Sequence, residues 1–268
     1  MNFIDLFCGA GGFSLGFKTA GFEHLWGMDN DISASQVYSA NIGKCILADI
    51  RGYNFKDYEG KIDVVIGSPP CQSFSCANTS TRECDTELTN EFFRAVSEIH
   101  PKFWVMENVP AVSDFVGAPF KEVYDMSMYG LLQKRRRLFC SNIELKIPKT
   151  KNKYLNEDQE RKLREFRPEG IIRKYPTITC RYNSFGKISP HIQDGDRVRV
   201  LNHDEALALQ TFPFYFNFGN LGQRETEILI GNAVPPAFAY KIAIFLKSCI
   251  DSAVGHWSVW TTVQKTFV

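Results

Sequence analysis

A cysteine that follows two prolines is the residue best placed to do chemistry in this chain. Cys71 lies in the stretch Gly67-Ser-Pro-Pro-Cys-Gln-Ser-Phe-Ser75, directly after an apolar run at residues 62–66. The run predicts a buried strand, and the two prolines, which lack N–H donors, force the chain out of the sheet. Cys71 therefore falls at the carboxyl end of a strand, where open α/β sheets carry their ligands. A thiol held there suits a nucleophile, whereas a lone free cysteine is more often a buried structural residue, so this stretch alone leaves both roles open.

A glycine-rich turn near the start of the chain could bind a nucleotide-like ligand. Residues 2–7 predict a strand, residues 13–20 have helical spacing, and Gly9, Gly11 and Gly12 lie between them. Glycines let a ligand approach the backbone closely, and the N–H groups at a helix start attract negative charge. The spacing differs from the Gly-x-Gly-x-x-Gly dinucleotide fingerprint, and such a turn can also serve only close strand–helix packing.

Acidic residues follow the next two predicted strands. Residues 24–28 predict a strand that ends in Asp29, and an acid about 20 residues after the glycines is placed to bind ribose hydroxyls. Asp29 could instead cap the following helix. Residues 45–48 predict a third strand, which Asp49 and Ile50 end. Three successive strands that end in polar or glycine elements favour a cofactor pocket along the strand ends.

Another carboxylate and a basic run stand at the ends of later predicted strands. Residues 103–106 predict a buried strand that ends in Glu107, which can face the same crevice as Cys71 or can be an ordinary exposed acid. Residues 133–137 read Gln-Lys-Arg-Arg-Arg and precede an apolar strand at 138–140. Charge runs are usually solvated surface, but arginines at a sheet end could hold a phosphate or a carboxylate.

Length, composition and charge are typical of a globular α/β protein. The 268 residues suit one large domain, with or without a small second lobe, and we expect no run long and apolar enough to span a bilayer. The start of the chain lacks the pattern of a secretion signal. The eight cysteines form no Cys-x-x-Cys pair, which predicts neither a zinc site nor a disulfide framework and favours a reducing, cytoplasmic location. The formal net charge of +1 gives no global hint of nucleic acid, although a local basic surface could bind it.

The second half of the chain combines helices with a polar insertion. Residues 87–100 predict an amphipathic helix, and the polar stretch at 75–89 reads as a loop of the kind that often forms a lid. Lys and Arg become frequent at 149–174, which is typical of an inserted lobe. The other predicted elements are a strand at 197–201 that leads to a possible N-cap at Asn202, β-structure with a turn at 175–186, and helices at 33–41, 157–166, 204–209, 225–230 and 237–249.

Taken together, these residues resemble the DNA cytosine-5 methyltransferase family, and the match covers nearly the whole chain. One such motif would be weak evidence, but six in the family's order are specific. They are the cofactor motif Asp5-Leu-Phe-Cys-Gly-Ala-Gly-Gly12, the Pro-Cys motif at 67–75, Glu107-Asn-Val109, the Gln-x-Arg-x-Arg motif at 133–137, the ninth motif Arg199-Val-Leu-Asn-His-Asp-Glu205 with Leu209-Gln-Thr-Phe-Pro213, and the tenth motif Gly231-Asn-Ala-Val234.

The resemblance implies a chemistry that these residue types can perform. Cytosine C5 is a poor nucleophile, and a Cys71 thiolate that adds to C6 would enable C5 to take a methyl group from S-adenosylmethionine. Glu107 would supply positive character at ring N3, Arg135 would hold the base carbonyl, and Arg137 matches the second arginine of its motif. The target cytosine would be flipped out of the duplex. Loss of the C5 proton and elimination of Cys71 would then release the product.

The resemblance also implies a fold and partners. We expect an α/β, Rossmann-like methyltransferase fold with a mostly parallel seven-stranded sheet, helices on both faces and a small target-recognition lobe. Residues 1–140 would form the first catalytic and cofactor-binding part, 141–196 a short recognition region, and 197–268 a return to the catalytic domain that brings 231–234 beside the glycine turn. The expected partners are duplex DNA and a cognate restriction endonuclease. We expect a monomer without a metal or a membrane contact.

The family's binding residues carry over to named positions of this chain. The implied cofactor-binding residues are Phe7 near the adenine, Gly9, Gly11 and Gly12 at the methionine part, Asp29 at the ribose with Asn30 after it, Asp49 and Ile50 at the adenine, Pro70, and Asn232 and Ala233 at the methionine end. The implied DNA-binding residues are Gln72, Ser75, Arg82, Thr179, Arg181 and Tyr182.

Departures from the family pattern leave the substrate open. The recognition region is unusually short for the family, so it predicts neither the DNA sequence nor, by itself, the type of nucleic acid. Two alternatives follow: a methyltransferase of tRNA cytosine, whose branch usually carries a Cys-Phe-Thr triplet that this chain lacks, and a catalytically silent nucleic-acid-binding relative, against which the intact catalytic set argues. The departing residues are Asn30, where an aromatic residue is common, Leu132, where Pro is usual, and His203-Asp204, where Pro-Arg is usual.

Overall fold

A seven-stranded sheet forms the centre of the protein. The structure is a computed structural model that describes residues 1–70, 86–150, 177–183, 191–194 and 197–253. The strand order is β3-β2-β1-β4-β5-β7-β6, in which β7 runs antiparallel to both of its neighbours and the other pairs are parallel. This sheet confirms the predicted Rossmann-like fold. Its strands are β1 (Asn2–Leu6), β2 (Glu23–Asp29), β3 (Cys45–Leu47), β4 (Val64–Gly67), β5 (Phe103–Asn108), β6 (Phe120–Asp125) and β7 (Arg136–Ser141).

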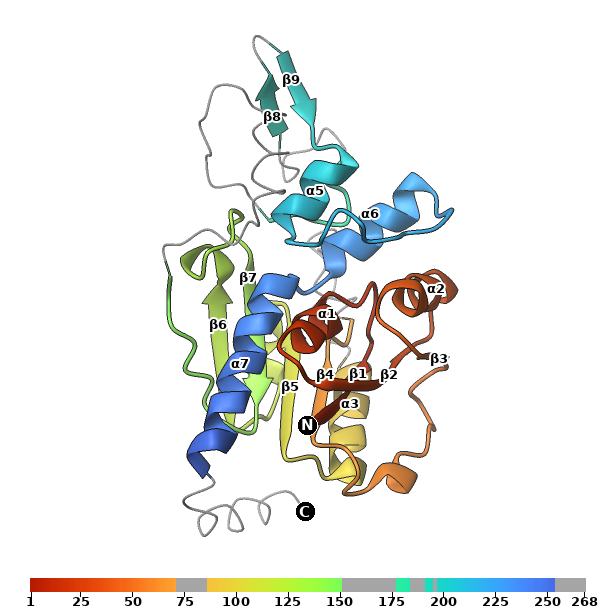
Figure 1. The fold of residues 1–268 in the computed structure, drawn as a ribbon, viewed down its shortest axis with the longest axis vertical. Helices are drawn as coiled ribbons and strands as arrows, with labels where there is room; N and C mark the ends of the chain where they lie inside the picture. Colours follow the sequence, from red (N-terminus) through yellow and green to blue (C-terminus); the bar gives the residue numbers. More distant parts are fainter. Residues whose placement is uncertain (71–85, 151–176, 184–190, 195–196, 254–268) are drawn as a thin grey trace.

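Helices cover both faces of the sheet, as predicted (Figure 1). Successive side chains of a strand point to opposite faces, so each central strand contributes to two cores. In β1, Phe3 packs with α1 (Gly12–Thr19) and α7 (Pro236–Ala253), whereas the neighbouring Ile4 packs in the core that contains α3 (Glu87–Ile99). The connections described by the structure include the short 3-10 helices η1 (Lys56–Tyr58), η2 (Pro110–Phe115) and η3 (Met126–Met128).

A smaller part of the molecule lies beyond the carboxyl ends of the strands (Figure 1). It contains the antiparallel pair β8 (His191–Asp194) and β9 (Arg197–Val200), followed by α5 (His203–Leu209) and α6 (Gln223–Asn232). The predicted N-cap at Asn202 is confirmed, because its side chain accepts from the Glu205 N–H in a capping box. A third core joins α5 and α6 to α2 (Ile32–Asn41) of the sheet domain.

The prediction of β-structure at 175–186 is wrong for the described residues 177–183, which form a turn without strand pairing. Side chains from the 133–137 segment take the place of a neighbouring strand here. Gln133 Oε1 accepts from the Ile178 N–H at 3.0 Å, and Arg135 donates to the Ile178 carbonyl at 2.9 Å. Because buried backbone groups need partners of some kind, these contacts satisfy the segment without a ladder.

The last helix returns to the glycine turn, as predicted. A Cβ on Gly12 would collide with the Val234 carbonyl oxygen, so the two backbones are in direct contact. One turn further along α1, a Cβ on Gly16 would lie 2.6 Å from the Pro236 carbonyl oxygen. The absence of side chains at these two glycines therefore allows α7 and the 231–234 segment to pack against the first strand–turn–helix unit.

One segment of the described residues contradicts the expectation that no run is long and apolar enough to span a bilayer. Gln223–Ile250 passes that test by length and composition. It comprises α6 and α7, which are interrupted at 233–235, and 61% of its apolar window is buried inside the protein. A helix whose apolar residues pack into a protein core meets the same criterion, so its composition follows from packing against the sheet.

Candidate active site and cofactor pocket

The glycine turn at the end of β1 is held open by its neighbour β2. Phe7 and Gly9 both have positive φ, 57° and 52°, which curls the chain at the strand end. The Gly9 N–H donates to Asp29 Oδ2 at 2.9 Å, and the Asp31 N–H donates to Asp29 Oδ1 at 3.0 Å. A Cβ on Gly9 would have no atom within 4 Å. The turn therefore presents an open backbone beside a fixed carboxylate.

Burial raises the pKa of Asp29 above its usual value, and hydrogen bonds from the Asp31 and Gly9 backbone act in the opposite direction. These bonds occupy one lone pair on each oxygen, so the carboxylate can still accept from hydroxyl groups of a ligand. Asn30, the next residue, is exposed. The predicted ribose acid is thus placed at a strand end beside the glycines.

The end of β3 supplies the next predicted cofactor residues. Asp49 is exposed and forms an ion pair with Arg51 at 2.9 Å, whereas Ile50 is buried in the core on the α3 side. Leu47, the last residue of β3, is 50% exposed although it belongs to the central sheet. Leu47 is in register with Asp29, so its exposed side chain lies at the same strand end as the predicted ribose acid. The sequence indicates it only indirectly, through its position two residues before Asp49.

Glu107 at the end of β5 is the most unusual carboxylate of the site. It is 4% exposed, and Arg137 Nε on the adjacent β7 lies 3.0 Å from its Oε1 as an ion pair. Among the described residues, this buried oxygen is paired with Arg137 as an ion pair and makes no well-aligned hydrogen bond. Burial raises the pKa of Glu107, and the positive charges of Arg137 and Arg135 lower it. A buried carboxyl group whose Oε1 faces only an ion-pair partner is available to a ligand, and it can donate a hydrogen bond when it carries a proton.

The corner that leads to the predicted nucleophile lies next to Glu107. Asn108 Nδ2 donates to the Pro69 carbonyl at 3.2 Å, which ties the end of β5 to the end of β4. The described chain stops at the exposed Pro70. Because β4 lies between β1 and β5, this corner emerges between the glycine turn and Glu107. The predicted residues Cys71, Gln72, Ser75 and Arg82 lie outside the described residues, and their roles stay predictions.

The structure places Arg135 differently from the expected contact with a base carbonyl. Its side chain is 0% exposed, and its two Nη atoms donate to the main-chain carbonyls of Ile178, Gly231 and Ala233 at 2.9 to 3.1 Å. Burial lowers the pKa of its guanidinium. Arg135 thus joins three chain segments, and Arg137 is the arginine that faces Glu107. Arg135 also cannot contribute to the expected positive surface.

The tenth motif and the predicted DNA-binding residues lie around α6. Asn232 is exposed and Ala233 is half-buried beside the glycine turn. Of the described DNA-binding candidates, Arg181 is exposed and Thr179 half-buried, whereas Tyr182 is buried. Tyr182 would therefore have to become more exposed in order to contact DNA.

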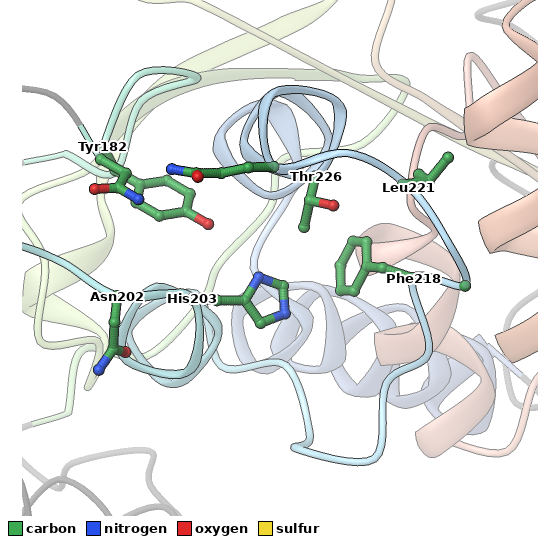
Figure 2. Close-up of a pocket in the computed structure, with 9 residues that line it drawn as sticks. Tyr182, Asn202, His203, Phe218, Leu221 and Thr226 are labelled. Carbon is green, nitrogen blue, oxygen red and sulfur yellow. The ribbon is translucent and has the colours of Figure 1, made fainter.

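Tyr182 forms a wall of a cavity of about 430 Å³ between the turn at 177–183 and α5 and α6 (Figure 2). His203, which stands where the family usually has Pro, lines the cavity and packs edge-on against Phe218, with 5.4 Å between ring centroids. Burial lowers the pKa of His203, which favours its neutral form. The other lining residues are Asn183, Asn202, Gly219, Leu221, Gln223 and Thr226.

Comparison with known proteins identifies the family of this chain. The sequence model of the family described as C-5 cytosine-specific DNA methylase matches residues 1–116 and 151–248. The type II methyltransferase M.HindV of Haemophilus influenzae is 31% identical over 293 residues, which cover 91% of this chain and 95% of M.HindV. The chain therefore belongs to the C-5 cytosine-specific DNA methylase family.

Two further relatives differ in coverage. The type II methyltransferase M.DdeI of Desulfomicrobium norvegicum is 37% identical over 173 residues, which cover 55% of this chain and only 42% of M.DdeI. Among solved structures, the S. pombe Dnmt2 methyltransferase superposes with a TM-score of 0.68 over 93% of this chain and 99% of that one. Its sequence identity is 14%, so that likeness concerns the fold.

Proposed function

We propose that this protein transfers a methyl group from S-adenosylmethionine to C5 of a cytosine in duplex DNA. The observation that carries the proposal is Glu107, a buried carboxyl group at the end of β5 that is ion-paired with Arg137 of β7. Family membership and relatives named type II methyltransferases support the same reaction. The corner that precedes Cys71 follows β4, which adjoins β5, and the glycine turn follows β1, which adjoins β4. Donor and nucleophile would thus lie at neighbouring strand ends, as such a reaction requires.

The residues present fit the cofactor that the family implies. The space beside the Gly9 backbone, which a side chain would occupy, can admit a ligand. Asp29 retains acceptors for two ribose hydroxyls. Leu47 offers an exposed apolar side chain for an adenine ring. We assign the remaining contacts to Phe7, Gly11, Gly12, Asn30, Asp49, Ile50, Pro70, Asn232 and Ala233. When bound, S-adenosylmethionine supplies an electrophilic methyl group on a sulfonium centre.

On the substrate side, we assign the nucleophile to Cys71 and the base contacts to Glu107 and Arg137. A Glu107 carboxyl group that carries a proton can donate to ring N3, and its raised pKa favours that form. Arg137, with donors beside Glu107, takes the base carbonyl in place of Arg135. These contacts need the cytosine outside the helix, because its reacting face is covered in a stacked duplex.

The substrate and the biological setting follow from the relatives. M.HindV and M.DdeI are named type II methyltransferases, which favours sequence-specific methylation of duplex DNA in a restriction–modification system with a cognate endonuclease. Such a protein acts where the genome lies, in the cytoplasm of a prokaryotic cell. Affinity for DNA should fall as the salt concentration rises, because contacts between basic side chains and phosphates release counterions.

A labelling experiment tests the proposal. The protein is incubated with S-adenosylmethionine carrying a labelled methyl group and with duplex DNA or tRNA, and the modified base is mapped. We expect label at C5 of cytosine in DNA, its loss in Cys71→Ala, and a fall of about 100-fold or more in Glu107→Gln. Glu59→Gln, an exposed acid that precedes β4, is the matched control and should retain full activity.

A second assay identifies the nucleophile. Duplex DNA with 5-fluorocytosine at the target should form a covalent adduct with the wild-type protein, because fluorine cannot leave as a cation and elimination stops. The adduct should be missing in Cys71→Ala. Label in tRNA alone would contradict the DNA substrate, and an adduct through Cys8 or Cys76 would show that another thiol attacks.

A further inference from the structure

Two cysteines meet beside the glycine turn, outside the proposed reaction. Cys8 lies in the turn after β1 and Cys45 begins the edge strand β3, and their sulfur atoms are 3.7 Å apart. The two residues are 37 positions apart in the chain, so the fold brings them together. Both thiols are reduced, and a disulfide needs sulfurs about 2.05 Å apart. The two sulfur atoms are therefore in contact but not bonded.

The two thiols differ in exposure and acidity. Cys8 is buried, and burial raises the pKa of its thiol. Cys45 is half-buried, and the hydrogen bond with Cys8 lowers its pKa to about 7, with a further contribution from Ser35. The thiolate is the reactive form of cysteine, and an accessible thiolate beside a second thiol is the arrangement in which oxidation proceeds to a disulfide.

We propose that Cys8 and Cys45 are an oxidative modification site, which a peroxide closes to a disulfide that weakens binding of S-adenosylmethionine at the adjoining turn. The Cys45 thiolate attacks one peroxide oxygen, and the O–O bond breaks to leave a sulfenic acid on Cys45 and hydroxide. Cys8 then attacks the sulfenic sulfur and displaces the hydroxyl group, which leaves as water once protonated. In total, two thiols lose two electrons and two protons, and hydrogen peroxide becomes two molecules of water.

Closing the pair brings its sulfur atoms together by about 1.7 Å, directly beside the turn. The Cys8 N–H is bonded to the Met28 carbonyl at 3.0 Å, and Gly9 is bonded to Asp29. Cys45 is in register with Gly27, and β2 is the one strand of the described residues that pairs with β3. We expect strain from the new bond to pass through these contacts and to shift the glycine backbone relative to Asp29. The effect on the cofactor rests on the proposed function, whereas formation of the disulfide does not.

Peptide mapping tests the bond itself. Trypsin should release residues 1–18 and 45–51 as separate peptides, and each contains a single cysteine. After the reduced protein is treated with hydrogen peroxide, mass spectrometry without reductant should show these two peptides joined. Cys45→Ser should abolish the joined species. Its absence from the oxidised wild type, or Cys8 and Cys45 joined to other cysteines instead, would overturn the proposal.

Calorimetric titration with S-adenosylmethionine tests the consequence. Reduced protein should bind, oxidised protein should bind at least about tenfold more weakly, and a reductant should restore the affinity. Cys45→Ser should keep its affinity in peroxide, while Cys249→Ser, a control on α7, should lose affinity like the wild type. By linkage, saturating S-adenosylmethionine should disfavour the disulfide by the same factor.

The outcomes separate the two claims. Equal affinity of the reduced and disulfide forms overturns the regulatory effect. A reduced protein that does not bind S-adenosylmethionine overturns both the cofactor assignment and the regulatory effect, while the peptide map still decides whether the thiol pair is an oxidative site.

Discussion

Asp5 in β1 shows how burial controls an acid behind the glycine turn. It accepts from the Ser14 hydroxyl at 2.6 Å, which contacts the Tyr38 hydroxyl at 2.6 Å, and Tyr38 in turn contacts His24 Nε2 at 2.8 Å. Burial raises the pKa of Asp5 to about 8, although the Ser14 hydrogen bond opposes it. The Asp5 carboxyl group is therefore mainly neutral near pH 7, as a member of a hydrogen-bonded chain.

This raised pKa predicts a pH dependence of stability. The folded protein holds a proton on Asp5 up to about pH 8, whereas the unfolded chain releases it near 3.8. The unfolded state thus binds fewer protons between these values, so the contribution of Asp5 to the free energy of unfolding falls as pH rises from about 4 to about 8. Asp5→Asn keeps an acceptor for Ser14 and removes this loss.

Thermal unfolding of both proteins between pH 5 and pH 9 checks the prediction. Relative to the wild type, Asp5→Asn should gain stability on the order of a few kcal/mol from pH 5 to pH 9. Titrations shared by the two proteins cancel in the difference. A difference that stays constant over this range would show that Asp5 titrates in the folded state near its ordinary pKa.

At the scale of elements, the apolar runs predict most strands and helices at nearly their observed positions, because β1, β4 and β5 are buried on both faces. β6 is missing from the prediction, since this edge strand exposes its first three residues and has no apolar run. The antiparallel direction of β7 is also absent from any local pattern. It follows from which strands become neighbours, and that depends on the whole chain.

The contact between α1 and α7 yields a prediction at this scale. A Cβ on Gly16 would lie 2.5 Å from the Tyr240 backbone N and 2.6 Å from the Pro236 carbonyl oxygen. Backbone atoms cannot swing aside, so Gly16→Ala must push the helices apart. We expect the free energy of unfolding to fall by about 1–3 kcal/mol or more.

Urea denaturation of matched variants measures this effect. Gly117→Ala is the control, because its Cβ would meet no atom within 4 Å and its φ is not positive. It should change stability by less than about 0.5 kcal/mol. Equal effects of the two substitutions would mean that the α1–α7 contact is loose enough to absorb a methyl group.

At the scale of the whole molecule, the 133–137 segment joins the sheet to the smaller part. Gln133 Nε2 donates to the Leu209 carbonyl at 2.8 Å and to Gln210 Oε1 at 2.7 Å, while Arg135 reaches Ile178 and the tenth motif. The sequence identifies this motif but cannot tell which arginine faces Glu107. The roles of the two arginines depend on which of them the distant 178 and 231–233 segments bury. No local sequence pattern contains that information.

Exchanging each arginine for lysine separates the two roles. Arg135 is buried on three carbonyls, and a lysine cannot reproduce its planar fork, so carbonyls would be left unpaired at about 1–3 kcal/mol each. We expect Arg135→Lys to lower the free energy of unfolding by about 2–5 kcal/mol. Arg137→Lys, at a half-buried position, should change it by less than about 1 kcal/mol and lower the methylation rate by about 100-fold, because the contact beside Glu107 is lost.

Urea denaturation and single-turnover methylation, measured on the same preparations, decide between these outcomes. Below its unfolding transition and with saturating cofactor, the folded fraction of Arg135→Lys should retain more activity than Arg137→Lys, since Arg135 acts through the segments it joins rather than on the base. A stable Arg135→Lys protein without methylation would instead return Arg135 to the base site. It would then require the three carbonyls to find other donors when DNA is bound.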